Sequence, residues 1–223
     1  MLAINTLGVL YLVESGEQVQ SIADLRGKTI YSAGKGATPE YALNYILTKN
    51  GINPQTDVTI EYKAEHAECV AALTANPDAV AMLPQPFVTT AQTKNESIRI
   101  AVDLNEAWEA AAKEDGTESA LITGVVVARK EFIEQYPDAV EQFLADYEKS
   151  VTFVNEKTDE AAALIGAADI VPEAVAKKAL PYCNITLIKG DEMQEKLGGY
   201  LEVLYSQNTA AVGGACPDEA FYY

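Results

Sequence analysis

The segment Asp24-Leu-Arg-Gly-Lys-Thr-Ile-Tyr-Ser-Ala-Gly-Lys-Gly-Ala-Thr-Pro-Glu-Tyr-Ala-Leu-Asn-Tyr-Ile-Leu-Thr-Lys-Asn-Gly51 decides the fold. A short β-favouring run leads to Gly34 and Gly36, which free the backbone for a tight turn. Thr38 followed by Pro39 is the residue order of a helix N-cap and the first helical position. The sequence therefore predicts one strand that enters one helix through a glycine-rich turn.

The predicted helix start is a candidate binding site. Free N–H groups at Gly36 to Glu40 would point out of the helix, where the macrodipole is equivalent to about half a positive charge. An anion or a carbonyl oxygen would be held there, and Lys35 would add a charge. A well-capped surface helix with a solvated lysine is the competing interpretation. The candidate ligand-binding residues of this segment are Ser32, Lys35, Gly36, Ala37 and Thr38.

Two nucleotide-binding motifs are excluded by spacing. A P-loop needs a glycine five residues before its Gly-Lys pair, and Ile22 stands at that distance from Gly27-Lys28. A dinucleotide fingerprint after Gly34 needs a third glycine where Pro39 stands. We expect no nucleotide cofactor.

Composition limits the class of protein. The 223 residues, 48% hydrophobic, are enough for one large domain or two small ones. A net charge of −17 argues against nucleic acid or an anionic membrane surface as the main partner. The three cysteines allow at most one disulfide. His66, the single histidine, has usable metal-ligand spacing only with Cys69, so we expect no metal site and no cofactor.

Three segments together resemble a known family: Ser21–Ile30, Gly34–Glu40 and Leu83-Pro-Gln-Pro-Phe87. They are similar to the extracellular solute-binding proteins of ABC transporters, in the branch of aliphatic sulfonate, nitrate, taurine and thiamine-precursor binders. The resemblance implies a type II periplasmic-binding-protein architecture, in which two α/β lobes close over a small molecule. It implies capture of a polar, anionic or heteroaromatic ligand and its delivery to a permease, without catalysis.

The resemblance places the end of the strand before Pro84-Gln85-Pro86 near the ligand cleft. Each proline fixes its own φ and restricts the preceding residue. Gln85 would be an uncharged donor and acceptor at the rim, where many relatives have a glutamate. A simple strand-to-helix corner is the equally weighted alternative.

A repeated pattern predicts the division into lobes. Leu121–Ala128 repeats the threonine, glycine and valine-led order of Asn5–Leu12, and we expect the two to pair as crossing strands. Residues 15–120 would form one contiguous α/β lobe, and residues 1–14 and 121–223 a second, incomplete lobe. Thr6 and Thr123 would lie near the hinge, where their hydroxyls reach a ligand or satisfy backbone groups.

The N-terminal apolar run, residues 1–13, is too short for a membrane span and is predicted to be one strand. The resemblance implies a signal or lipoprotein segment and a first βα region before it. We therefore expect an N-terminally incomplete form of a periplasmic or membrane-anchored extracellular protein, with self-association through the incomplete lobe. The competing expectation is that the C-terminal helices close the gap.

Two other functional classes remain as alternatives. One is an enzyme of the same fold related to thiamine-pyrimidine synthesis, although the histidine-rich and cysteine-rich motifs of that branch are missing. The other is a ligand-sensing module without transport. No catalytic residue is predicted, because the lone histidine removes the commonest triads.

Overall fold

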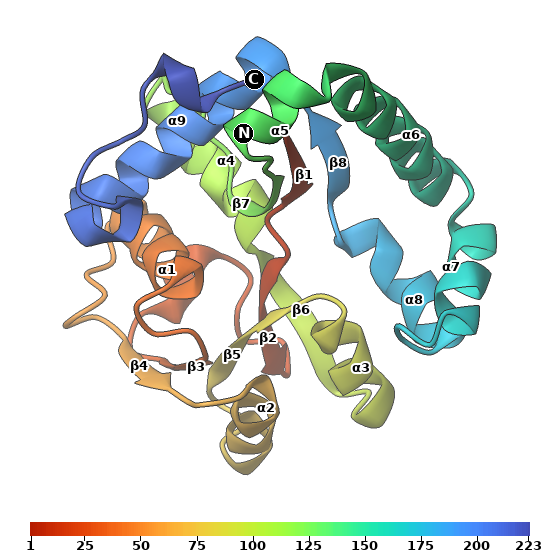
Figure 1. The fold of residues 1–223 in the computed structure, drawn as a ribbon. Coiled ribbons are helices and arrows are strands. Elements are labelled where there is room, and N and C mark those ends of the chain that lie inside the picture. The colour runs from red at the N-terminus through yellow and green to blue at the C-terminus, as the bar shows by residue number, and fades with distance from the viewer.

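The computed structural model describes residues 1–223 and contains two β-sheets with helices around them (Figure 1). The strands are β1 (Ala3–Leu7), β2 (Leu10–Ser15), β3 (Thr29–Ser32), β4 (Thr59–Tyr62), β5 (Val80–Pro84), β6 (Ile98–Asp103), β7 (Ile122–Val126) and β8 (Ile185–Ile188). The α-helices are α1 (Thr38–Lys49), α2 (His66–Ala75), α3 (Phe87–Lys94), α4 (Leu104–Glu114), α5 (Lys130–Gln135), α6 (Pro137–Glu156), α7 (Thr158–Ala167), α8 (Glu173–Ala179) and α9 (Gly190–Gln207). Short 3₁₀ turns are η1 (Ile22–Leu25), η2 (Leu180–Tyr182), η3 (Thr209–Val212) and η4 (Glu219–Phe221).

The larger sheet has five strands in the order β4-β3-β5-β2-β6. β3 runs parallel to β4 and β5, whereas β2 runs antiparallel to β5 and β6. Four of the five strands, β3, β4, β5 and β6, therefore run in one direction, and only β2 runs in the opposite one. The reason lies in β2, which enters the sheet from β1 at the edge where β5 ends, and so has to run in the opposite direction.

Helices cover both faces of this sheet. Residues on one face of β2, β3 and β5 share a core with α1 and α4, whose largest buried side chain is Trp108. Residues on the other face, including Tyr11 and Tyr31, pack against Cys69 and Leu73 of α2 and against α3. The result is a three-layer α/β lobe in which alternate residues of each strand face opposite layers.

The smaller sheet has three antiparallel strands in the order β7-β1-β8. Ile4 pairs with Val125 and Leu7 with Ile122, so the predicted pairing of the two repeated segments is confirmed. α6 packs beside this sheet through Val140 and Leu144. α7 and α8 form a helical hairpin with a small core of their own.

The prediction of one strand over residues 1–13 is wrong, because the chain breaks at Gly8 and Val9 and changes sheets there. Figure 1 shows the chain passing from β1 above to β2 below. Gly8 is buried, and a Cβ at this position would lie 2.8 Å from the side chain of Leu121. All of β2, including its residues before the expected lobe boundary at residue 15, pairs inside the five-stranded sheet. We therefore propose residues 10–120 as the first lobe and keep the rest as the second.

Helix α9 belongs to both lobes. Its buried residues Leu197 and Tyr200 share one core with Trp108 of α4 and with Ile4 of β1. Gly199 permits this approach, because a Cβ there would lie 2.4 Å from the backbone oxygen of Glu118. α9, within the residues 121–223 expected in the second lobe, therefore packs on elements of both sheets.

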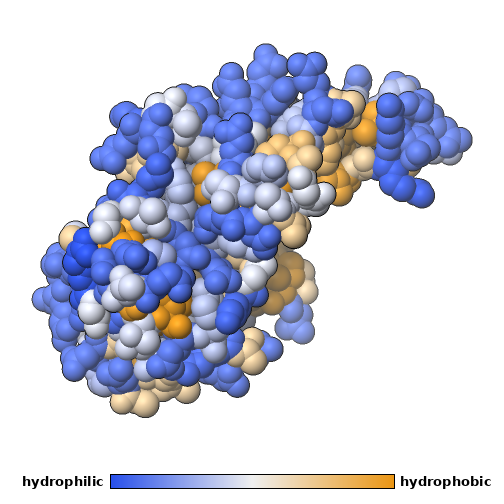
Figure 2. All heavy atoms as spheres, turned by 90° about the vertical axis from the view of Figure 1, so that its left-hand side faces the viewer, coloured by the Kyte–Doolittle hydropathy of each residue, from blue (hydrophilic) through white to orange (hydrophobic).

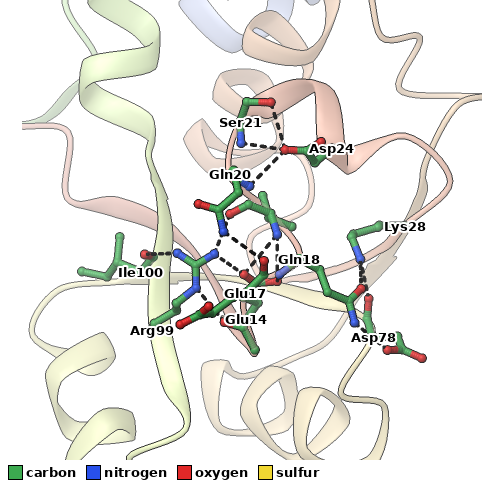
Figure 3. Close-up of polar contacts among 12 residues, drawn as sticks. Glu14, Glu17, Gln18, Gln20, Ser21, Asp24, Lys28, Asp78, Arg99 and Ile100 are labelled. Atoms are coloured by element: carbon green, nitrogen blue, oxygen red, sulfur yellow. Dashed lines mark hydrogen bonds and ion pairs between the residues drawn. The ribbon is translucent and has the colours of Figure 1, made fainter.

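A buried ion pair fixes the loop that leads into η1 and then into β3 (Figure 3). Glu14, which is 2% exposed, forms an ion pair with Arg99. Its carboxylate also accepts hydrogen bonds from the backbone N–H groups of Gln18 at 3.2 Å and Val19 at 3.1 Å. Arg99 in turn donates to the carbonyl oxygen of Val19 at 2.6 Å. Every group that the carboxylate touches is a donor, so its burial is compensated.

The outer surface is mainly hydrophilic in the view of Figure 2, with hydrophobic atoms confined to small separate patches. None of the helices combines the length and the apolar character that a membrane span requires.

Candidate functional site

The topology marks one edge of the five-stranded sheet as the candidate site. After β3 the chain passes to α1 on one face, and after β4 it passes to α2 on the other face. β3 and β5 are adjacent, so the strand order reverses between them. Ligands of open α/β sheets bind outside the carboxyl ends of the strands at such a switch point.

Three segments meet at this edge: the turn 33–37 after β3, Gln85 after β5, and the crossover 7–9 before β2. Leu10 pairs with Pro84, which brings the crossover beside the end of β5. The backbone N–H of Gln85 also donates to the carbonyl oxygen of Val9 at 2.9 Å. The sequence predicts ligand-binding residues in the turn and at Gln85, and the sheet places them at the ends of neighbouring strands.

The glycines of the turn have the role that the sequence predicts. Gly34 and Gly36 have φ values of +81° and +77°, which residues other than glycine rarely adopt. A Cβ on Gly34 would also lie 2.9 Å from the ring of Pro39. The turn therefore depends on glycine at both positions.

The helix start differs from the prediction. Ala37 is the N-cap and Thr38 is the first helical residue. The N–H of Ala37 donates to the carbonyl oxygen of Gly34 at 3.2 Å, and that of Glu40 donates to Ala37 at 3.0 Å. The N–H of Gly36 donates to Oε2 of Glu40 at 2.6 Å. The expectation of free N–H groups is therefore wrong at these three residues, because the turn bonds to itself and the chain supplies its own carboxylate.

The side chains of this segment face different surroundings. The Ser32 hydroxyl is fully buried and donates to the carbonyl oxygen of Ala33 at 2.9 Å. The Thr38 hydroxyl lies 2.9 Å from the Tyr200 hydroxyl of α9. Lys35 is exposed, and its ammonium lies 5.7 Å from the centroid of the Tyr62 ring. Of the predicted residues, Lys35, Gly36 and Ala37 are open to solvent and Ser32 is not.

Tyr200 of α9 contacts the candidate site through Thr38, and the sequence does not predict this contact. Its ring packs on Trp108 with centroids 5.6 Å apart, and burial raises the pKa of its hydroxyl. Tyr200 lies 162 positions away from Thr38 in the chain, so no local sequence pattern predicts the contact between them.

Gln85 carries an unpaired donor. The residue is 6% exposed, and its Oε1 accepts hydrogen bonds from the N–H of Thr89 at 3.2 Å and from its hydroxyl at 2.9 Å. Its Nε2 is buried without a partner, a condition shared in this structure only by Nδ1 of His66. A buried polar group without a partner costs about 1–3 kcal/mol. The Gln85 amide thus has a fixed orientation and a free donor.

The crossover 7–9 is held by side chains from both lobes. The Thr123 hydroxyl donates to the carbonyl oxygen of Leu7 at 2.5 Å, and Asn184 donates to that of Gly8. The N–H of Gly8 donates to Oδ1 of Asn105 at 3.1 Å. Thr123 therefore satisfies the backbone. Asn184 and Asn105 were not singled out from the sequence, although the positive φ of Asn184, +45°, is a conformation that asparagine favours.

Thr6 lies on β1 beside this crossover and pairs with Gly124 of β7. Its hydroxyl is 3.5 Å from Oδ1 of Asn5. A Cβ on Gly124 would lie 2.8 Å from that hydroxyl, so the two strands approach closely here. Thr6 and Thr123 are thus brought together at the crossover.

No group of three or more histidine, cysteine, aspartate or glutamate side chains is arranged to hold a metal ion. The three cysteines are free thiols. Burial raises the pKa values of Cys69 and Cys183.

One family model matches the chain over residues 4–174. Its description is "ABC transporter, phosphonate, periplasmic substrate-binding protein". Comparison with curated protein sequences gives no match.

Several solved structures share the fold. An ABC transporter protein from Parabacteroides distasonis has 21% identity and a TM-score of 0.71, with 100% of this chain and 73% of that chain covered. The periplasmic aliphatic sulphonate binding protein SsuA from Escherichia coli has 15% identity and a TM-score of 0.70, with 94% and 69% covered. The alkanesulfonate-binding protein SsuA from Xanthomonas axonopodis pv. citri, bound to MOPS, has 16% identity and a TM-score of 0.63, with 92% and 68% covered. The two-lobed α/β architecture expected from the sequence is confirmed by these matches.

Proposed function

Because the chain belongs to the family of periplasmic substrate-binding proteins of phosphonate ABC transporters, we propose that it captures a small polar ligand at the switch-point edge and delivers it to a permease. The ligand would lie between the first lobe and the second. The protein would work on the outer side of the membrane, in the periplasm or anchored at the cell surface. It would bind its ligand without changing it.

The unpaired amide of Gln85 is the observation that carries this proposal. An orphan donor that is more than nine-tenths buried lowers stability unless a further partner is bound. It lies at the edge where the sheet topology favours a ligand. A hydrogen-bond acceptor on a ligand would supply the missing partner.

The other candidate residues take roles that follow from their contacts. Lys35, Gly36 and Ala37 would form the exposed wall of the site, while Ser32 and Thr38 hold the turn in place. Thr6 and Thr123 would shape the crossover on the opposite side.

Self-association is a further part of the proposal. β7 pairs only with β1, and Val125 and Val127 beside its free edge are 39% and 65% exposed. An exposed apolar edge strand is a template for pairing with another chain. β2, by contrast, lies inside the larger sheet between β5 and β6. Light scattering over a range of concentrations would detect association, and a monomer at every concentration would contradict it.

A ligand screen tests the proposed function. A ligand present at a hundred times its dissociation constant stabilises a protein by about 2.7 kcal/mol, which raises the melting temperature. Alkylsulfonates, alkylphosphonates, nitrate and pyrimidines are suitable first compounds. Each ligand should be recovered unchanged by mass spectrometry, because turnover would favour an enzyme.

The variant Gln85→Leu removes the free donor from the proposed site. We expect it to weaken binding about tenfold, which corresponds to about 1.4 kcal/mol. Gln55→Leu, at an exposed turn residue, is the matched control and should bind normally. Equal affinities of wild type and a folded Gln85→Leu protein would remove Gln85 from the site.

A further inference from the structure

The two proposed lobes are joined differently on the two faces of the larger sheet. On the face that α1 covers, the hydroxyl of Tyr200 in α9 lies 2.9 Å from that of Thr38. The side chains of Gln207 and Asn208, at the end of α9, donate to the carbonyl and hydroxyl oxygens of Tyr41 at 3.0 Å each. These bonds accompany the core that α9 shares with α1 and α4. On this face the lobes are therefore tied together through α9.

On the other face, a single hydrogen bond crosses between the lobes. The hydroxyl of Tyr11 on β2 donates to the carbonyl oxygen of Tyr182 in η2 at 2.7 Å. The two rings meet edge to face, with centroids 6.3 Å apart and an angle of 88° between their planes. No other hydrogen bond or ion pair joins residues 10–120 to residues 121–189. On the same side α3 of the first lobe lies beside α8 of the second (Figure 1). We call the contact between Tyr11 and Tyr182 the latch.

The hydroxyl of the latch is a buried and permanent donor. Tyr11 is 1% exposed. Burial raises the pKa of its hydroxyl, and the neighbouring Asp103 and Cys183 raise this pKa further. The hydroxyl therefore stays protonated and keeps its proton for the carbonyl oxygen of Tyr182. Cys183 directly follows Tyr182, and its thiol is near enough to the Tyr11 hydroxyl to influence it.

The latch lies on the same side of the sheet as the free amide donor of the proposed site. Tyr11 is in register with Leu83 on β5, two residues before Gln85. Tyr11 and Leu83 belong to the core that packs against α3. The side chain of Gln85 also turns toward α3, because its Oε1 accepts the hydroxyl of Thr89. A change at the latch therefore acts on the side where Gln85 would meet a ligand.

The crossover 7–9 is bonded to the same segment as the latch. The N–H of Leu7 donates to the carbonyl oxygen of Asn184, two residues after Tyr182, at 3.1 Å. The crossover ends two residues before Tyr11. The latch is therefore the first contact beyond the crossover on this side of the sheet. A rotation of the lobes that widens the cleft on this side has to break it.

We infer that Tyr11 is a positioning residue that holds the cleft beside Gln85 closed through its bond to Tyr182. The face with α9 stays tied, so the lobes open on the side of α3 and α8. A ligand that contacts both lobes binds the closed arrangement, and the latch raises the fraction of molecules that are closed before the ligand arrives. The part of Tyr11 in ligand capture rests on the proposed function, whereas the latch itself is independent of it.

Alkylation of Cys183 measures the opening of the latch in the 223-residue chain. This thiol is half-buried beside the latch, whereas Cys216 is exposed and Cys69 is fully buried in the core of the first lobe. The variant Tyr11→Phe removes the hydroxyl and keeps the ring. We expect the alkylation rate of Cys183, followed by mass spectrometry, to rise about fivefold, the factor that corresponds to one neutral hydrogen bond. The rates of Cys216 and Cys69 should stay unchanged.

Tyr31→Phe is the matched control. Tyr31 is 7% exposed and belongs to the same core as Tyr11, but its hydroxyl accepts a hydrogen bond from Asn76 at 3.4 Å, within the first lobe. This variant should leave the alkylation of Cys183 unchanged. An unchanged Cys183 rate in Tyr11→Phe, or an equal rise in both variants, would overturn the latch.

The pH dependence of the rates separates opening from a local effect on the thiol. Opening changes the access to Cys183, so the ratio of the rates in Tyr11→Phe and the wild type should be the same from neutral to mildly alkaline pH. A ratio that falls toward one as the pH rises would indicate a lower pKa of the thiol and would overturn the latch. A parallel rise at Cys69 would indicate unfolding of the first lobe and would overturn it as well.

The outcomes separate this inference from the proposed function. Alkylation needs no ligand, so a screen in which no compound binds would overturn the proposed function and leave the latch standing. A compound that binds should slow the alkylation of Cys183 in the wild type, and it should bind Tyr11→Phe about fivefold more weakly. Equal affinity for Tyr11→Phe and Tyr31→Phe would overturn the part of Tyr11 in ligand capture.

Discussion

The substitution Glu14→Gln tests whether the buried ion pair holds the loop before η1. The Glu14 side chain is 3% exposed and that of Arg99 is 32% exposed. Breaking a buried pair from one side costs about 3–5 kcal/mol, because the remaining charge is left uncompensated. Arg99 keeps bonds to the carbonyl oxygens of Gly16 and Val19 and some contact with water, which places the cost near the lower end. We expect a loss of about 3 kcal/mol.

Part of this loss arises from the amide group itself. The carboxylate accepts the N–H of Val19 with both oxygens and the N–H of Gln18 with one of them. A glutamine has a single oxygen and turns an NH₂ group toward these donors. At least one backbone donor then loses its partner in a buried place. The loop 16–20 should loosen before the rest of the first lobe.

Urea unfolding measures the effect. With a slope of about 2 kcal/mol per molar, a loss of about 3 kcal/mol lowers the midpoint by about 1.5 M. The control Asp159→Asn removes an exposed ion pair with Lys177, whose side chains are 72% and 58% exposed, and should cost no more than about 1 kcal/mol. A midpoint of Glu14→Gln equal to that of the control would refute the reasoning.

Three further predictions concern single side chains. Gly199→Ala should lower stability by about 1–3 kcal/mol, because the new Cβ would lie 2.4 Å from a backbone oxygen; an unchanged melting temperature would contradict the close packing of α9. Among the thiols, alkylation followed by mass spectrometry should modify the exposed Cys216 first and the fully buried Cys69, whose pKa burial raises, only on unfolding. The pKa of Tyr45 is raised from 10.0 to about 12 by burial and by Asp115, so the neutral phenol is the form that the fold favours. Its contribution to stability is complete below pH 10 and is lost as the pH rises through about 12. Ultraviolet titration of the Asp115→Asn variant should show Tyr45 ionising at a lower pH than in the wild type.

Local signals in the sequence were sufficient for the elements around the site. Gly34 and Gly36 identified the turn because only glycine adopts their positive φ without strain. The repeated threonine, glycine and valine order identified the pairing of β1 with β7. Both features depend on residues that are close in the chain or share one pattern.

Contacts between distant segments could not be predicted in this way. Periodicity alone does not show that the apolar run breaks at Gly8, where the backbone packs closely against the side chain of Leu121 just before β7. The N-cap is Ala37 and not Thr38 as predicted, and the Thr38 hydroxyl is hydrogen-bonded to that of Tyr200 instead. The sequence predicts free N–H groups at the helix start, whereas the N–H of Gly36 is bonded to the Glu40 carboxylate and those of Ala37 and Glu40 to backbone oxygens.

The crossover and the candidate site share Gln85, and this joint role constrains how the lobes can move. Its backbone N–H bonds to Val9 of the crossover, while its side chain bonds to Thr89 at the start of α3 and leaves Nε2 free. The same crossover is held from the second lobe by Thr123 and Asn184. Buried backbone groups need partners, so a rotation about this segment has to exchange these bonds together. A ligand bonded to Nε2 of Gln85 would therefore contact a residue whose backbone N–H is bonded to the crossover, the segment about which the lobes would turn.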